Sequence, residues 1–179
     1  MRDICIDLET TSTDPYHGAI LQIGAVKFDL FTGEIGDTFQ VSLKIPHNRY
    51  WSEDTRQFWA KNLDLYNHIT QNAMEPKEGF IKFVEWVKQT HSPHFWAKPI
   101  TFDFNWIQSY CDQYDIKIPF EFWKARDLRS FMLGVFAPDP LPRVKMKPGL
   151  TEHDALQDAL SEAMWAIDTY KWKVNNGQK

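Results

Sequence analysis

Two acidic residues, Asp7 and Glu9, stand two positions apart in the stretch ICIDLETTST, residues 4–13. They alternate with apolar residues such as Leu8, a pattern typical of a buried β-strand whose side chains point alternately to opposite faces. We therefore expect both carboxylates on the same face of a sheet, where they repel each other. On their own, the two acids are equally compatible with a solvated strand edge.

A third acid, Asp103, follows the short apolar stretch HFWA, residues 94–97, and lies in the first turn of a predicted helix. The helix macrodipole favours an acid at this position, and this effect alone is enough to explain Asp103. The alternative is a carboxylate near the carboxyl end of a strand, where ligands gather in open α/β sheets.

The stretch TEHDALQDAL contains His153 and Asp158. Residues five apart are about 140° apart around a regular helix, so the two do not share a face by spacing alone. Thr151 and Asp154 resemble a capping box, which predicts that His153 lies in the frayed first turn. The two residues can serve one site only if His153 lies before the helix or at its loosened start. Otherwise they are a solvated acid and a helix-start histidine.

Several acids close together repel one another, and bound divalent cations are the best explanation for such a cluster. Mg²⁺ and Mn²⁺ are hard ions that prefer carboxylate oxygens. The sequence has no cysteine and histidine spacing of the kind that binds zinc. We therefore expect a magnesium or manganese site in which the carboxylates are the ligands.

The elements that must position these residues can be read from the hydrophobic pattern. Predicted strands cover residues 2–10, 19–29, 37–45, 94–97 and 122–128. Predicted helices cover residues 55–62, 63–70, 75–90, 102–114, 128–136 and 153–174. Three strands joined by short links indicate an antiparallel start, and the later alternation of helices and strands indicates an α/β domain with a mixed sheet.

Two of these helices have a recognisable buried face, and the first helix has candidate caps. Either Ser52 or Asp54 can cap the helix over 55–62. The helix over 75–90 is predicted to bury Phe80, Phe83, Val84 and Val87. The last helix is predicted to bury Leu156, Leu160, Ala163, Met164 and Ile167.

Composition restricts the class of protein. The chain has 179 residues, 43% of them hydrophobic, which predicts one globular domain over residues 1–179. No apolar run approaches the roughly 20 residues of a membrane span, and the start does not resemble a signal sequence. Cys5 and Cys111 lie in apolar patterns and are predicted to be buried thiols, as expected in the cytoplasm. A net charge of −4 argues against a nonspecific nucleic-acid coat but not against a local basic patch.

The stretches DLET, FD at 102–103 and HDALQD resemble, in order and type, the three motifs of the DnaQ-like DEDDh 3′–5′ exonucleases of the RNase H-like superfamily. The resemblance spans almost the whole chain. The stretches TRQFW, FWKARDLR and a tryptophan-alanine pair six residues before FD resemble a smaller branch, the phage exonuclease A and mycobacterial Rv-type exoribonuclease group. One departure is Lys98-Pro99, where many relatives have a small turn with asparagine. The resemblance implies a central five-stranded mixed sheet flanked by helices.

The resemblance also implies phosphodiester hydrolysis with two metal ions, Mg²⁺ or Mn²⁺. Asp7 would contact both ions, Glu9 and Asp158 would hold the ion that carries the attacking water, and Asp103 would hold the other. His153 would accept the proton of that water as the general base. A helix N-terminus disfavours imidazolium, so it would keep this histidine neutral.

For the substrate, the resemblance implies the 3′ end of single-stranded DNA or RNA, with release of nucleoside 5′-monophosphates. Glu9 and Thr10 would meet the 3′-hydroxyl, and Leu8 would pack on the terminal base. The resemblance also makes Trp59 the best candidate for stacking on a base, because of the place of its motif in the family. Relatives are often dimers, so a homodimer is a further expectation.

Two other functions fit part of the pattern. A catalytically silent nucleic-acid-binding domain is opposed by the presence of all five motif residues. An RNase H-like endonuclease would have no use for His153 at five residues before Asp158. Arg126 and Asp127 are interpreted as a structural ion pair. The basic residues that precede His153 are either a solvated loop or a guide for phosphate groups: Arg143, Lys145 and Lys147.

Overall fold

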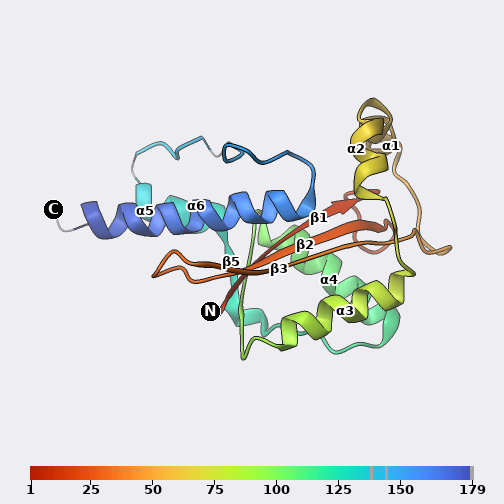
Figure 1. Cartoon of the computed structure of the whole chain (residues 1–179), viewed down its shortest axis with the longest axis horizontal. Helices are drawn as coiled ribbons and strands as arrows, with labels where there is room; N and C mark the ends of the chain where they lie inside the picture. The colour runs from red at the N-terminus through yellow and green to blue at the C-terminus, as the bar shows by residue number, and fades with distance from the viewer. Residues whose placement is uncertain (138, 144, 178–179) are drawn as a thin grey trace.

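The computed structural model describes residues 1–137, 139–143 and 145–177 (Figure 1). Its strands form one mixed sheet in the order β3-β2-β1-β4-β5. The strands are β1 (Asp3–Thr10), β2 (Ile20–Phe28), β3 (Ile35–Ser42), β4 (His94–Ala97) and β5 (Ala125–Asp127). The helices are α1 (Glu53–Lys61), α2 (Leu63–Ile69), α3 (Pro76–Lys88), α4 (Ile100–Tyr114), α5 (Leu128–Phe136) and α6 (Ala155–Asn176).

The acidic strand β1 lies in the middle of the sheet. It pairs antiparallel with β2, which pairs antiparallel with β3, and it pairs parallel with β4, which pairs parallel with β5. In this register Asp7 lies opposite Gly24 and Glu9 lies opposite Gln22. The predicted antiparallel start and the five-stranded mixed α/β sheet are confirmed.

Each face of the sheet is covered by helices. Helices α3 and α4 lie on one side of the sheet and α5 and α6 on the other (Figure 1). Alternation along β1 sends Ile4, Ile6 and Leu8 into the core under α3 and α4, and sends Cys5 into the core under α6. The predicted buried face of α3 is confirmed, as are the two buried thiols Cys5 and Cys111.

The face that α6 buries differs from the prediction. The residues against the sheet are mostly small and include Ala155, Ala159, Ala163 and Ala166. The predicted Leu156, Leu160 and Met164 are only half-buried, whereas Ala163 and Ile167 are buried as expected. The physical reason is close approach: a Cβ placed on Gly24 would lie 2.1 Å from the backbone of Ala155. Large side chains have no room between the start of α6 and β2.

The last strand is shorter than predicted. The predicted strand over 122–128 begins with a 3₁₀ turn, Phe122–Lys124, and only Ala125–Asp127 pair with β4. Helix α1 is capped by Ser52, one of its two candidates, which accepts from Thr55 N at 3.4 Å. In the part of the chain that the structure describes, no helix is long and apolar enough to cross a membrane.

The interpretation of Arg126 and Asp127 as an ion pair was wrong. Arg126 donates to the backbone carbonyls of Trp123 and Ala125. Asp127 instead accepts from two backbone amides, Ser130 N in the first turn of α5 at 2.7 Å and Ile100 N at the start of α4 at 3.0 Å. A carboxylate before a helix accepts from backbone amides that have no partner inside the helix. Asp127 makes these hydrogen bonds and not an ion pair with Arg126.

Candidate active site

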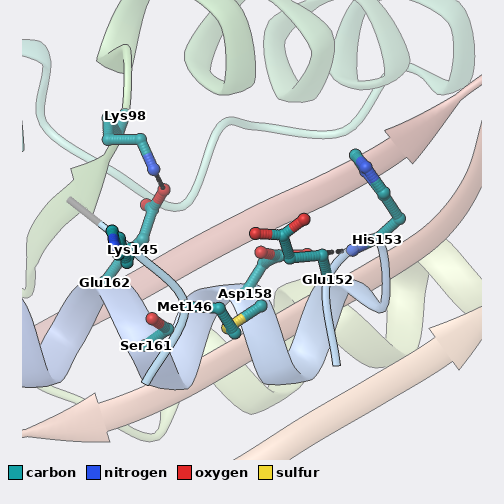
Figure 2. A pocket seen from close by; sticks show the side chains of 8 residues that line it. All are labelled: Lys98, Lys145, Met146, Glu152, His153, Asp158, Ser161 and Glu162. Carbon is teal, nitrogen blue, oxygen red and sulfur yellow. Dashed lines mark hydrogen bonds and ion pairs between the residues drawn. The ribbon is translucent and has the colours of Figure 1, made fainter. Parts of the chain in front are cut away.

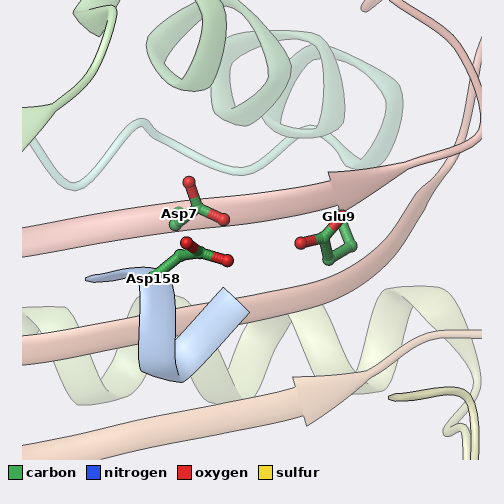
Figure 3. A group of neighbouring side chains, drawn as sticks. All are labelled: Asp7, Glu9 and Asp158. Carbon is green, nitrogen blue, oxygen red and sulfur yellow. The ribbon is translucent and has the colours of Figure 1, made fainter. Parts of the chain in front are cut away.

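Three carboxyl groups come together between β1 and α6. Asp7 and Glu9 of β1 and Asp158 of α6 each offer an oxygen, and these oxygens all lie within 4.8 Å of one another (Figure 3). Asp7 and Glu9 share the face of β1 that is turned towards α6, as their spacing predicted. Asp158, which the sequence analysis expected at the same site, lies within this group.

Burial and mutual repulsion disfavour the charged forms of this cluster. Burial, and after it the neighbouring charges of Asp103 and Glu162, hold the pKa of Asp7 well above its usual range. Burial and the charge of Asp158 raise the pKa of Glu9 to about 8. Burial also raises the pKa of Asp158. A cation among the three groups would remove this penalty, because a nearby positive charge favours carboxylates.

Asp103 lies in the first turn of α4, outside the group of three. Its side chain is 2% exposed, and its Oδ1 has no hydrogen-bond partner among the residues that the structure describes. Its charge is close enough to raise the pKa of Asp7. A buried carboxylate oxygen without a partner is costly, so this oxygen is available to a ligand. Asp127 positions it by accepting from Ile100 N at the start of the same helix.

His153 lies before α6 and not in its first turn, so the predicted capping box was wrong. The N-cap is Asp154, whose Oδ1 accepts from Gln157 N at 3.2 Å. His153 has a left-handed backbone, with φ of 62°, and its N donates to Asp158 Oδ2 at 2.7 Å (Figure 2). This bond brings the histidine to the carboxylate despite the five-residue spacing. Its ring is exposed and packs edge-to-face on Phe58 at 4.9 Å.

Two glutamines that the sequence analysis missed hold the start of α6 on the sheet. Gln22 Oε1 accepts from Ala155 N at 2.9 Å, and Gln40 Nε2 donates to Asp154 Oδ1 at 3.1 Å. The signal in the sequence is weak: Gln22 is a polar residue inside an otherwise apolar strand, and it is buried. Because these bonds fix the first turn of α6, they also fix the position of Asp158.

The predicted substrate residues have different surroundings. Thr10 lies beside the cluster, at the end of β1, and its hydroxyl donates to Ser12 O at 2.7 Å. Leu8 packs in the core on the opposite face, so its position does not support contact with a base. Trp59 is 3% exposed and donates to Thr10 O at 3.2 Å, so it supports the strand end and has no free face for stacking.

The basic residues before α6 divide into two groups. Lys147 forms an ion pair with Asp168, and its ammonium lies 3.9 Å from the centre of the Trp165 ring. Arg143 and Lys145, in contrast, are exposed; Lys145 lines the cavity that contains Asp158, and Arg143 lines a second cavity that shares Lys98 with it. The cavity of about 250 Å³ beside Asp158 is shown in Figure 2.

That cavity is also lined by an ion pair, Lys98 and Glu162, that the sequence analysis did not identify. Lys98 Nζ lies 2.8 Å from Glu162 Oε1, and Glu162 is one turn after Asp158 on the buried side of α6. The signal for Glu162 was a glutamate at i+4 from a candidate ligand, within a stripe of alanines.

The donor set fits hard divalent cations. The groups that meet are carboxylates, and one buried oxygen of Asp103 lacks a partner among the described residues. Oxygen donors of this kind suit Mg²⁺ and Mn²⁺. Cys5 lies on the same face of β1, and burial raises the pKa of its thiol, which disfavours the thiolate that soft metals require.

Solved structures with a similar fold include nucleases. The nuclease domain of 3′hExo, a DEDDh family member bound to rAMP, is 18% identical, with a TM-score of 0.68 and coverage of 97% of this chain and 92% of that one. S. pombe Pop2p in its Mg²⁺- and Mn²⁺-bound form is 12% identical, with a TM-score of 0.64 and coverage of 98% and 84%. E. coli Exonuclease I in complex with a dT13 oligonucleotide is 10% identical, with a TM-score of 0.67 and coverage of 98% and 41%.

Sequence comparison identifies the family. No curated protein sequence matched the chain. The family model of the 3′-5′ exoribonuclease Rv2179c-like domain matches residues 2–169, nearly the whole chain. The resemblance to DnaQ-like DEDDh nucleases and to the mycobacterial branch is thereby confirmed. The chain belongs to the Rv2179c-like 3′-5′ exoribonuclease domain family and is a hydrolytic nuclease.

Proposed function

We propose that residues 1–179 form one catalytic domain that hydrolyses single-stranded RNA or DNA from the 3′ end with two divalent metal ions and releases nucleoside 5′-monophosphates. The observation that carries this proposal is the group of Asp7, Glu9 and Asp158, with oxygens within 4.8 Å of one another. Like charges at this separation are unfavourable unless cations or protons neutralise them. The unpartnered Oδ1 of Asp103, close to Asp7, supports a second ion.

Asp7, Glu9 and Asp158 would hold one ion, and Asp7 with Asp103 the other. Mg²⁺ or Mn²⁺ in these positions would stabilise the attacking and leaving oxygens of an in-line displacement at phosphorus. The Mg²⁺- and Mn²⁺-bound form of the similar Pop2p supports this choice of ions. The protein residues contribute by holding four carboxylates at fixed positions on rigid elements.

His153 would accept the proton of the attacking water. Its ring is exposed, while its backbone amide is bound to Asp158, so the ring can reach a water held above that carboxylate. The edge-to-face contact with Phe58 restricts the ring without using either ring nitrogen. A positioned base of this kind contributes about 10²- to 10⁴-fold to a hydrolysis rate.

The surroundings of β1 support cleavage from an end. Beyond Glu9 the strand is covered by α1: Trp59 donates to Thr10 O, and Ser52 N donates to Thr11 O at 2.9 Å. Helices α1 and α2 lie beyond this end of the strand in Figure 1. A nucleic-acid strand that continued past Glu9 would meet protein, whereas a terminal nucleotide can stop there, beside Thr10.

RNA is the first substrate to test, because the matching family is described as an exoribonuclease. DNA is the second, since a similar fold is found in complex with dT13. The experiment uses RNA and DNA of one sequence, labelled at the 5′ end, with either terminus blocked. We expect labelled ladders that shorten one nucleotide at a time, release of 5′-monophosphates, and inhibition by a blocked 3′ end only.

Other products would contradict the proposal. Internal fragments from strands blocked at both ends would indicate an endonuclease. Binding without hydrolysis in Mg²⁺ and in Mn²⁺ would indicate a silent binding domain. Full activity after exhaustive chelation would exclude the proposed role of the carboxylates.

A further inference from the structure

An ion pair that the proposed metal site does not use lies beside the carboxylate group. Lys98 Nζ lies 2.8 Å from Glu162 Oε1 (Figure 2). Glu162 Oε2 accepts from the thiol of Cys5 at 3.9 Å. The side chain of Glu162 is 4% exposed, whereas that of Lys98 is 33% exposed. The buried acid therefore anchors an ammonium group whose remaining protons face solvent.

Lys98 forms part of the wall of two neighbouring cavities. The cavity of about 250 Å³ that contains Asp158 and His153 is lined by Lys98 and Lys145 at its other end. A second cavity, of about 330 Å³, is lined by Lys98 together with Arg129 and Arg143. Both arginines are exposed. Four cations therefore line the two cavities that meet at Lys98, in a protein whose net charge is negative.

The order of residues along β1 and α6 shows on which side of the carboxylates the cations lie. On β1, Cys5, Asp7 and Glu9 occupy successive positions of one face, and Glu162 contacts the first of them. On α6, Glu162 follows Asp158 by four residues, which is one turn or about 6 Å along the axis. The ion pair thus lies on the side of Asp7 opposite Glu9, at a spacing comparable to that between successive phosphates of an extended strand.

The charge of Lys98 is retained despite its partial burial. Burial lowers the pKa of Lys98, but the charge of Glu162 and the hydrogen bond that Lys98 donates to it outweigh burial, so that the pKa of Lys98 is raised. An ammonium group has three donors, and the contact with Glu162 uses one. The other two are available to an anion in the cavity.

We propose that Lys98, positioned by Glu162, binds the first phosphate upstream of the cleaved bond, and that Arg129 and Arg143 continue the path of the substrate strand. This inference rests on the proposed function, which places the 3′ end beside Glu9 and Thr10 and the cleaved phosphate at Asp7 and Asp158. The strand would then leave the site over Lys98. The competing interpretation is a purely structural pair that only neutralises Glu162.

The test removes one phosphate charge at a time from the substrate. Each oligonucleotide carries one neutral methylphosphonate linkage. This linkage is either the first one upstream of the cleaved bond or a remote one, four linkages further upstream. In every substrate, the nucleotide on the 5′ side of the methylphosphonate is a 2′-deoxynucleotide. For the wild-type enzyme, the first replacement should lower kcat/KM by about 10- to 100-fold, the contribution of a hydrogen bond to a charged group. The remote replacement should have a much smaller effect.

Protein variants then show whether Lys98 is the residue responsible for that loss of kcat/KM. In Lys98→Gln the first replacement should change kcat/KM less than about threefold, since the charged partner is already absent. Glu162→Gln keeps the lysine and an acceptor for it, so it should retain most of the wild-type sensitivity. The double variant K98Q/E162Q leaves no buried unpaired charge and should behave as Lys98→Gln. Lys77→Gln, an exposed lysine on α3, is the matched control and should behave as wild type.

Salt dependence gives a second measurement. The slope of log(kcat/KM) against log[salt] should fall by about 0.7 in Lys98→Gln, the value for one lost contact with a single-stranded phosphate. Lys98→Arg should restore it. Circular dichroism and urea unfolding establish that each variant is folded.

The outcomes separate the two proposals. If the methylphosphonate at the first linkage lowers kcat/KM equally in wild type and in Lys98→Gln, the proposed phosphate contact of Lys98 is overturned. The proposed exonuclease activity would still stand. A lower kcat/KM in Lys98→Gln that K98Q/E162Q restores, with the wild-type sensitivity to the first replacement retained in both variants, would establish the purely structural pair. A wild-type enzyme that releases no nucleotides from RNA or DNA would overturn both.

Discussion

At the scale of single residues, Asp7 is a carboxyl group whose pKa is raised by its burial and by the charges of the other acids of the site: Asp103, Glu162, Glu9 and Asp158. It belongs to the group with Glu9 and Asp158, and the charge of Asp103 raises its pKa. Asp7→Asn should lower the hydrolysis rate by more than about 100-fold, because even residues that only support metal ligands contribute 10- to 100-fold. The metal-free variant should be at least as resistant to urea as wild type, since a repulsive charge is gone.

Asp112→Asn is the matched control, an exposed acid on α4 that accepts from Gln108. It should retain the rate and stability of wild type. If Asp7→Asn keeps more than a tenth of the rate in pure, folded enzyme, Asp7 is not a metal ligand.

His153→Ala tests the assigned base. We expect kcat to fall by about 10²- to 10⁴-fold, with little change in the Mg²⁺ concentration needed for half-maximal rate, because the carboxylates are unchanged. Added imidazole or a higher pH should partly restore the rate by replacing the missing base. His91→Ala, an exposed histidine before β4, is the control. A normal kcat in His153→Ala would limit the role of the residue to the backbone bond with Asp158.

Glu9 predicts how the stability of the metal-free protein depends on pH. Burial and the charge of Asp158 raise its pKa from 4.5 to about 8, so between these values the folded protein retains a proton that the unfolded chain releases. The free energy of unfolding should therefore fall as pH rises from about 4.5 to about 8. Saturating Mg²⁺ should remove much of this loss.

Glu9→Gln should flatten that dependence. At pH 8 the variant should be more stable than wild type by about 1 kcal/mol or more, the equivalent of a single pKa unit, and near pH 4 the two should agree. Urea unfolding at both pH values measures the difference, with Glu78→Gln, an exposed acid on α3, as the control. A wild-type stability that rises between pH 5 and pH 8 would contradict the protonated cluster.

At the scale of elements, the site depends on the close approach of α6 to β2. A Cβ on Gly24 would lie 2.1 Å from Ala155 C and Leu156 N. Gly24→Ala should therefore displace the start of α6, destabilise the fold by about 1–3 kcal/mol, and lower the rate strongly by moving Asp158.

Gly134 in α5 provides the control for that change, because a Cβ there meets no atom within 4 Å. Gly134→Ala should raise stability by about 0.5–1 kcal/mol, owing to the better helix propensity of alanine, and leave the rate unchanged. Equal rates for Gly24→Ala and wild type would show that α6 does not need this approach.

The sequence predicted the elements better than their contacts. Period-two alternation placed Asp7 and Glu9 on one face, and the apolar pattern located all six helices. It could not identify the buried face of α6, because hydrophobicity favours leucine whereas the contact with Gly24 requires alanine. The position of His153 depends on a left-handed residue before an aspartate cap, which no spacing rule specifies. Lys98 and Glu162 meet across 64 residues, so only the fold reveals their pairing.

At the scale of the whole molecule, both faces of the sheet pack against helices, and the face under α6 also carries the chemistry. Helices α3 and α4 bury the apolar side of β1, while α6 contributes an acid to its polar side. Helix α1 covers one end of that polar side, and the cavities at Lys98 lie at the other end. This asymmetry fits a substrate with one free end. The homodimer stays a prediction.

The measurement that tests this account most directly is anomalous X-ray diffraction from crystals soaked in Mn²⁺ with a nucleoside 5′-monophosphate. We predict two manganese peaks, one in contact with Asp7, Glu9 and Asp158 and the other with Asp7 and Asp103. Asp7→Asn crystals treated in the same way should lose both peaks or retain one weakly. Crystals that bind Mn²⁺ elsewhere, or that show no ion between these carboxylates at saturating concentration, would contradict the account.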